Sequence, residues 1–171
     1  MRIRQETPAD YDEVYAMVKR SFATADHSDG TEQDYLTELR KKSTFIPALS
    51  LVAQTGEQIV GQIVLYKMQI HCGDRTLEEL VLSPLSVHAE HFGQGIGAAL
   101  IAEGCKRALE HGYRAVFLCG DPVYYSRFGF VPTHRHGIFH VNDSEKNANW
   151  CMVKELVEGC LAGITGVVEI E

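Results

Sequence analysis

Three alternating glycines, Gly93, Gly95 and Gly97, form the part of the chain whose residue types point most directly to chemistry. They follow an apolar segment and lead into a run with the composition of a helix. The first backbone N–H groups of a helix have no partner within it and lie at the positive end of its dipole, so they bind anions. Glycine leaves the main chain open to such a ligand. Residues 92–97 therefore predict a phosphate or pyrophosphate site, and a ligand-free strand-to-helix turn is the alternative.

A histidine pattern, HxHxxxH, is formed by His134, His136 and His140 in a segment that we expect to be a loop. Imidazole is a common metal ligand, so the pattern raises the question of a metal site. No carboxylate or cysteine stands at a spacing that would complete such a site, so we expect surface or hydrogen-bonded histidines and no bound metal. The five cysteines are scattered without a CxxC pair, which is typical of reduced thiols in a cytoplasmic protein.

The elements that position these residues follow from periodicity and turn signals. Alternating or apolar segments predict strands at 2–5, 50–54, 58–70, 76–87, 115–119, 150–155 and 166–170. Helical spacing and capping residues predict helices that begin near Pro8 and Thr31, a third over 94–110 and a short one that begins at Asp121. Three strands joined by short turns form an antiparallel meander, and the strand–helix–strand run from 76 to 119 implies a parallel pair. The predicted fold class is α/β, with a mixed, mostly antiparallel sheet and helices on both faces.

Residues 82–101 and 120–130 together resemble the acyl-CoA-binding core of the GNAT-type N-acetyltransferases. The family's pyrophosphate motif is Arg or Gln, two residues, Gly, one residue, then Gly or Ala. It falls here on residues 92–97, with Phe92 in place of Arg or Gln, which removes one side-chain contact near the phosphates. The resemblance implies one domain over 1–171 with a splayed parallel strand pair. It implies acetyl-CoA as co-substrate, bound by Leu85, Ser86, Val87, Phe92, Gly93, Gln94, Gly95, Ile96, Gly97 and Ala98.

The strand before this turn contains Pro84. Proline cannot donate to a ladder, so we expect a bulge or a splayed edge near this residue. In the family the strand splays at the corresponding place, and the pantetheine arm bonds to the exposed main chain as a peptide adds to a sheet edge.

Catalytic residues are implied by the same resemblance. The family often places a tyrosine four residues before the glycine of Tyr-x-x-x-Gly-Phe, which selects Tyr125. A phenol with a pKa near 10 is protonated at neutral pH and can donate to a departing thiolate, whereas a packed core tyrosine is the alternative. The family sometimes carries its general base on the strand where Glu78 and Glu79 lie. These two side chains point to opposite faces, and the prediction is Glu79, with a water chain as the alternative.

The implied function is transfer of an acetyl group from acetyl-CoA to a primary amine, directly in a ternary complex. A non-catalytic acyl-CoA sensor is one alternative. A dinucleotide-binding oxidoreductase is another, because Gly93, Gly95 and Ala98 fit GxGxxA, although the turn does not open a βαβαβ half-domain.

Charge and hydropathy limit the partners. The net charge of −7 argues against nucleic acid and an acidic membrane surface. The sequence contains no apolar run that spans a bilayer and does not begin with a signal peptide, so a cytoplasmic location is expected. The acceptor, a small-molecule or peptide amine, stays open, and so does the oligomeric state, a homodimer included.

Overall fold

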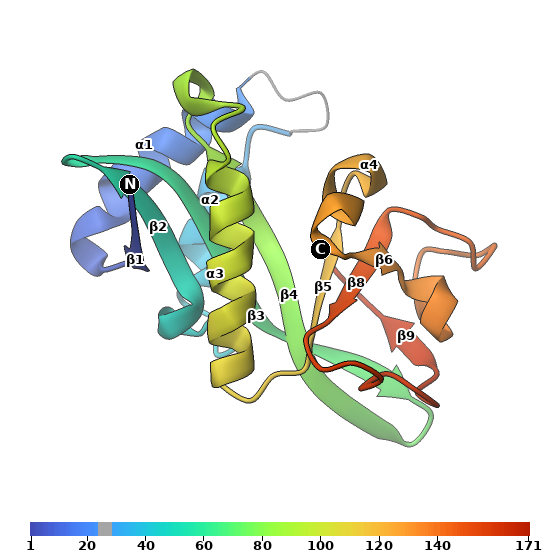
Figure 1. Cartoon of the computed structure of the whole chain (residues 1–171). Helices are drawn as coiled ribbons and strands as arrows, with labels where there is room; N and C mark the ends of the chain where they lie inside the picture. Colours follow the sequence, from blue (N-terminus) through green and yellow to red (C-terminus); the bar gives the residue numbers. More distant parts are fainter. Residues whose placement is uncertain (24–28) are drawn as a thin grey trace. The chain divides into compact units, whose positions relative to one another are not determined.

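The computed structural model of the protein describes residues 1–23 and 29–171. The chain folds into two compact units, Met1–Tyr66 with Ser83–Arg107 and Lys67–Leu82 with Ala108–Glu171. Two long strands, β3 (Gln58–Cys72) and β4 (Arg75–Val87), run through both units (Figure 1). The single domain expected over residues 1–171 stays a prediction. Along the described residues, no helix is both long and apolar enough to cross a lipid bilayer.

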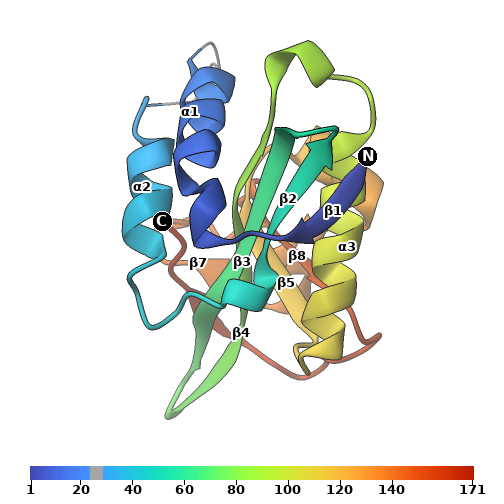
Figure 2. The ribbon, with the colours of Figure 1, turned by 90° about the vertical axis from the view of Figure 1, so that its left-hand side faces the viewer.

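An antiparallel sheet forms the centre of the first unit. β1 (Arg2–Gln5) pairs with β2 (Ser50–Thr55), and β2 pairs with β3 across a tight turn at Gly56. Figure 2 shows α1 (Tyr11–Phe22) and α2 (Glu32–Leu39) on one side of these strands and α3 (Ile96–Glu110) on the other. Because helices cover both faces, β2 and the neighbouring part of β3 are almost continuously apolar and buried.

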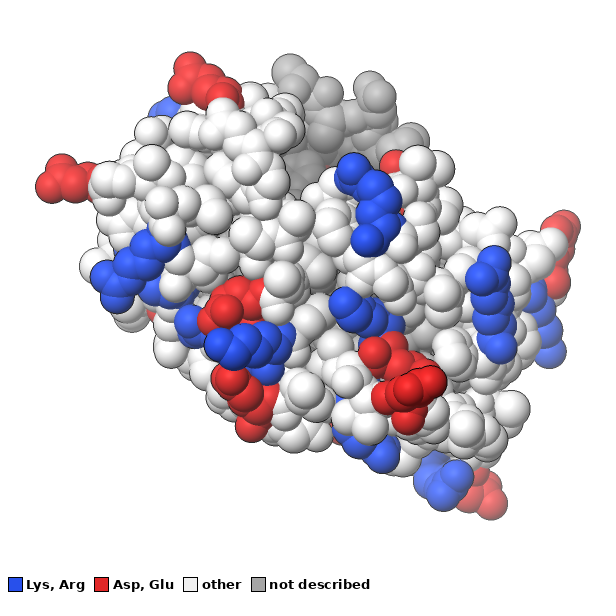
Figure 3. All heavy atoms as spheres, in the orientation of Figure 1, with Lys and Arg blue, Asp and Glu red and all other residues white. Residues whose placement is uncertain are grey.

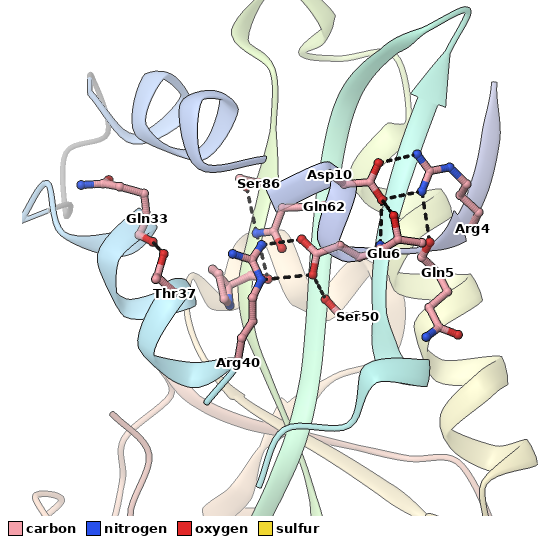
Figure 4. Close-up of polar contacts among 12 residues, drawn as sticks. Arg4, Gln5, Glu6, Asp10, Gln33, Thr37, Arg40, Ser50, Gln62 and Ser86 are labelled. Carbon is pink, nitrogen blue, oxygen red and sulfur yellow. Dashed lines mark hydrogen bonds and ion pairs between the residues drawn. The ribbon is translucent and has the colours of Figure 1, made fainter. Parts of the chain in front are cut away.

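Polar contacts fix the entry to α1 (Figure 4). A 3-10 turn, Pro8–Asp10, precedes the helix, and the Thr7 N–H donates to Asp10 Oδ2 at 2.7 Å. The Arg4 guanidinium donates to both Asp10 carboxylate oxygens, at 2.7 and 2.8 Å. This hydrogen-bonded pairing holds the pKa of Asp10 well below its usual range. Asp10 therefore joins β1 to the helix that follows it.

A buried polar cluster of Glu6, Arg40 and Ser50 ties the end of α2 to β1 and β2 (Figure 4). Ser50 Oγ donates to Glu6 Oε2 at 2.7 Å, and Arg40 pairs with the same carboxylate through Nε and Nη2. The guanidinium also stacks 4.0 Å from the centre of the Tyr11 ring. Each charged group is thus matched, as a buried ion requires.

The second unit contains the parallel pair. β4 pairs in parallel with β5 (Ala115–Cys119) through Leu80/Val116 and Val81/Phe117 only. β5 pairs antiparallel with β8 (Cys151–Glu155) over its full length, and β8 pairs with β6 (Val131–Pro132). α4 (Pro122–Tyr125) follows β5. The mixed sheet and α/β class predicted from the sequence are confirmed.

One local expectation was wrong. Residues 134–140 do not form a loop throughout, because Ile138–His140 is a strand, β7, that pairs in parallel with β9 (Gly166–Val168). β9 pairs in turn with β3 at Ile70 and His71. A three-residue strand has too little sequence to show a period of two, and its partner lies far along the chain.

On the face that Figure 3 shows, Lys and Arg side chains lie among Asp and Glu side chains rather than in one patch. A nucleic-acid-binding surface would gather its cations into a patch or stripe.

Candidate functional site

The predicted anion site is a turn whose donors are main-chain groups. A 3-10 turn, Ala89–His91, leads into it, and α3 begins at Ile96. Gly93 and Gly95 have φ values of 76° and 78°, in the left-handed region that favours glycine. Ala99 N–H makes the first helical bond, to Gly95 O at 3.0 Å. The N–H groups of Ile96, Gly97 and Ala98 lie in the first turn of the helix, where no helical carbonyl can accept them. They are therefore available to an anion.

The turn itself, residues 92–95, is exposed, and neither of its two large side chains is a cation. Phe92 is 59% exposed and is the position where the family motif has Arg or Gln. The Gln94 amide folds back onto the preceding turn, where Nε2 donates to Glu90 O at 3.3 Å and Oε1 lies 3.3 Å from His91 Nδ1. The site is therefore built from backbone amides and helix dipole rather than from a cationic side chain.

The end of β4 carries the next group of predicted residues, Leu85, Ser86 and Val87. Ser86 is buried, and its Oγ accepts a hydrogen bond of 3.0 Å from Gln62 Nε2 of β3 (Figure 4). Leu85 and Val87 are half-buried. β4 continues without interruption through Pro84, whose carbonyl accepts from the same Gln62 amide at 3.4 Å. The Ser86 hydroxyl thus has a structural partner, and its backbone is the part that a ligand would use.

Gly61 joins this strand end to the turn and was not singled out by the sequence. A Cβ on residue 61 would lie 2.9 Å from Ile96 Cγ2 and 3.2 Å from Ser86 O. A side chain here would require the Ile96 side chain to move and the Ser86 backbone to give by a few tenths of an ångström, so glycine permits the close approach of β3, β4 and the first turn of α3. The first unit therefore brings the predicted turn and the predicted strand end together.

Tyr125 lies in the second unit, at the end of α4. Asp121 caps this helix, as predicted, by accepting from Val123 N–H at 2.8 Å. The Tyr125 ring packs edge-on against Phe130, with 5.8 Å between ring centroids, and against the backbone of Gly120. Burial raises the pKa of Tyr125, and the nearby Tyr124 and Asp121 add to this effect. Among the described residues, none forms a hydrogen bond with the Tyr125 hydroxyl.

The Tyr-x-x-x-Gly-Phe sequence has a clear structural basis. Gly129 adopts φ 86°, which ends the 3-10 turn after α4. Lys154 Nζ donates to Phe128 O at 2.8 Å, and Phe130 is buried. The glycine and the phenylalanine therefore hold the turn that carries Tyr125.

Glu79, the predicted general base, has a structural task in the second unit. It is only 4% exposed, and its Oε2 accepts from the backbone N–H groups of Arg114 and Ala115, at 2.9 and 3.1 Å. These amides begin β5, so the carboxylate holds the start of that strand. A carboxylate already occupied by two donors is poorly placed to take a proton from an amine. We therefore do not retain the assignment of Glu79 as base.

The histidine pattern does not form a metal site in the part of the chain that the structure describes. No cluster of three or more His, Cys, Asp or Glu side chains is arranged to hold an ion there. His134 Nε2 lies 3.2 Å from Asn149 Oδ1. His140 is buried, and its Nδ1 accepts a hydrogen bond from the Asn142 N–H at 3.1 Å.

Comparison with known proteins identifies the family. Residues 2–133 match the family described as "Acetyltransferase (GNAT) domain". The chain belongs to the GNAT acetyltransferase family. It is 34% identical over 170 residues to the Escherichia coli K12 protein named "Uncharacterized N-acetyltransferase YhbS". The match covers 99% of this chain and 95% of that protein. The expected GNAT fold and acetyl-CoA-dependent N-acetyltransferase class are confirmed, and the oxidoreductase alternative is discarded.

Two solved structures of GNAT proteins are similar to this one. The E. coli YhbS structure in complex with CoA has a TM-score of 0.85 at 30% identity, covering 99% of this chain and 89% of that chain. A GNAT acetyltransferase from Brucella melitensis in complex with acetyl-CoA has a TM-score of 0.69 at 32% identity, covering 75% and 81%.

One further candidate was missed by sequence reasoning. Glu32, in the first turn of α2, has a buried carboxylate oxygen, Oε2, without a hydrogen-bond partner among the described residues. A buried carboxylate oxygen is normally hydrogen-bonded, and one without a protein partner is satisfied by a water, an ion or a ligand. Nothing in a lone glutamate at a helix start signals this property in the sequence.

Proposed function

We propose that this GNAT protein binds acetyl-CoA at the start of α3 and transfers the acetyl group to a primary amine, directly in a ternary complex. The observation that carries the proposal is the glycine turn at the start of α3, where the first helical bond is made by Ala99 N–H and the N–H groups of Ile96, Gly97 and Ala98 have no helical acceptor. The CoA and acetyl-CoA complexes of the two similar GNAT structures support the choice of ligand.

The residues of this turn would hold the pyrophosphate through the main chain. Gly93 and Gly95 keep the approach open, Ile96, Gly97 and Ala98 supply the donors, and Phe92 and Gln94 flank them. The main chain of Leu85, Ser86 and Val87 would bond the pantetheine arm as an added strand. The short β4–β5 ladder supports this role, because it contains only the Leu80/Val116 and Val81/Phe117 pairs.

Tyr125 would supply the proton that the departing thiolate needs. Its raised pKa keeps the phenol protonated at neutral pH, and its hydroxyl makes no hydrogen bond within the described residues. The attacking nitrogen must lose a proton as well. With Glu79 occupied at the start of β5, a water chain is the proposed route for that proton.

The acceptor amine would arrive as an ammonium ion. Glu32 Oε2, which is buried and has no hydrogen-bond partner among the described residues, is an acceptor that an ammonium would satisfy, so we assign it to acceptor binding rather than to proton removal.

The deciding experiment is a turnover screen of acetyl-CoA against an amine library that includes small amines, polyamines and peptides, with release of free CoA thiol as the readout. For a primary amine that is acetylated, initial rates measured against both substrates should give intersecting lines. Parallel lines would indicate an acetyl-enzyme and overturn the ternary complex. Tight binding of acetyl-CoA without thiol release for any amine would favour the sensor.

A further inference from the structure

Two cysteines of the second unit lie directly opposite each other on neighbouring strands. Cys119 ends β5, Cys151 begins β8, and the antiparallel register pairs these two residues. The next bond of the ladder runs from Gly120 N–H to Trp150 O at 2.9 Å, which makes Cys119/Cys151 a non-hydrogen-bonded pair. In such a pair the Cα atoms lie roughly 4.5 Å apart with both side chains on one face, within the range that a disulfide spans.

The surroundings of the two thiols differ. Cys119 is exposed, whereas Cys151 is fully buried. A hydrogen bond with Cys119, and a further one with the buried Thr133, lower the pKa of Cys151 against the effect of burial. The hydrogen bond with Cys151 raises the pKa of Cys119. The pair thus combines an accessible sulfur with a buried one whose thiolate is stabilised.

We propose that Cys119 and Cys151 form a reversible redox pair that closes to a disulfide when the protein meets a peroxide. Exposed Cys119 is the sulfur that the oxidant reaches, and its raised thiol pKa makes this first step slow. Cys151, whose thiolate is stabilised, is the nucleophile that resolves the oxidised form.

The atoms and electrons balance with hydrogen peroxide as the oxidant. Cys119 Sγ attacks one peroxide oxygen, an S–O bond forms, the O–O bond breaks, and the thiol proton leaves with the second oxygen as water. Cys151 Sγ then attacks Cys119 Sγ, the S–S bond forms, the S–O bond breaks, and a second water leaves. The two thiols lose two electrons in total, and one peroxide is reduced to two waters.

The bridge would lie next to the backbone on which the Tyr125 ring packs. Gly120 follows Cys119, and a Cβ on Gly120 would lie 2.5 Å from Tyr125 Cε2, so the aromatic ring rests on this piece of backbone. A disulfide to Cys151 would fix the Cys119 backbone, and with it the neighbouring support of the Tyr125 ring, in one position. Oxidation should therefore lower acetyl transfer, an effect that rests on the proposed role of Tyr125, whereas formation of the bridge does not.

The test treats the reduced protein with hydrogen peroxide and reads the intact mass, and then blocks the remaining thiols and reads the peptide map. We expect a loss of about two daltons, a Cys119–Cys151 cross-linked peptide, and reversal by dithiothreitol. Cys72→Ser is the matched control, because Cys72 is a half-buried cysteine near a strand end, and it should still form the bridge. Cys119→Ser and Cys151→Ser should each abolish it.

Two results would overturn the redox pair: no mass loss under peroxide, or a cross-link that involves other cysteines. Turnover of the acetylated amine is the second readout, and we expect it to fall at least about tenfold in the oxidised protein. Full turnover in a bridged protein would refute the link to Tyr125. A protein that forms the bridge under peroxide but acetylates no amine in its reduced state would refute the proposed function and leave the redox pair standing.

Discussion

Gly61 and Ser86 approach so closely that a Cβ on residue 61 would lie 3.2 Å from the Ser86 carbonyl oxygen. The same Cβ would lie 2.9 and 3.0 Å from the side chains of Ile96 and Leu100. Those side chains have rotatable ends, but the Ser86 carbonyl belongs to the strand that leads into the glycine turn. Packing at one glycine therefore sets the position of the proposed pyrophosphate and pantetheine contacts.

Gly61→Ala should push β4 away from β3 and weaken acetyl-CoA binding. We expect a loss of about 1–3 kcal/mol in unfolding free energy and a higher Kd for acetyl-CoA, measured by denaturant titration and calorimetry. Gly104→Ala is the matched control, because its Cβ would meet chiefly the movable Leu65 Cδ1 at 2.9 Å. An equal rise in Kd for both variants would contradict this role of Gly61.

Phe92→Arg should tighten CoA binding. Phe92 is exposed, so its replacement loses little packing, and a cation beside the proposed phosphates adds a screened attraction. We expect a Kd lower by about threefold at low salt, with the gain shrinking as salt rises. Leu109→Arg adds the same charge near the other end of α3 and should leave the Kd unchanged. A Phe92→Arg variant that binds CoA more weakly would indicate an apolar contact instead.

Tyr125→Phe should lower kcat by about 100-fold, because the thiolate loses its proton donor. Burial raises the pKa of Tyr125, so the phenol keeps its proton beyond pH 10, the ordinary value. The wild-type rate should therefore show no alkaline decline from this group between pH 7 and about pH 10. The control is Tyr124→Phe, which alters the adjoining ring and should keep most of the activity. Unchanged turnover of Tyr125→Phe at every pH would refute the assignment.

Two substitutions of Glu79 distinguish a structural role from a catalytic one. Glu79→Gln keeps a carbonyl oxygen for the Arg114 and Ala115 N–H groups, so stability and kcat should stay close to wild type. Glu79→Ala leaves those donors without their acceptor and should cost about 2–3 kcal/mol of unfolding free energy. A general base would give another pattern, with kcat of the glutamine variant reduced about 100-fold at normal stability.

Glu32→Gln should raise the KM for the amine and leave the KM for acetyl-CoA unchanged, because the ammonium loses a charged partner. We expect a rise of about tenfold, corresponding to a charged hydrogen bond. Glu38→Gln on the same helix removes only an exposed pair with Lys41 and should change neither constant. If both KM values for Glu32→Gln equal those of wild type, Glu32 has no part in acceptor binding.

The sequence was most informative where a site is made by neighbouring residues. The glycine turn at 93–97 and the Asp121 cap of α4 depend on local backbone geometry, and both formed where predicted. The α/β class followed from periodicity in the same way.

Contacts between distant segments could not be predicted in this manner. The role of Glu79 depends on amides 35 and 36 residues away, which no spacing rule connects. The close approach at Gly61 and the opposition of Cys119 and Cys151 depend on strand register, which is fixed only when the sheet assembles.

The backbone origin of the anion site has a consequence for how this family can diverge. The proposed donors are the backbone N–H groups of residues 96–98. A substitution at position 92 changes a side chain and leaves these N–H groups intact. Gly93 and Gly95 are different, because their positive φ values hold the amides in place. The side chain at position 92 can therefore change while the donors stay in place, whereas a residue at 93 or 95 that disfavours a positive φ would move them.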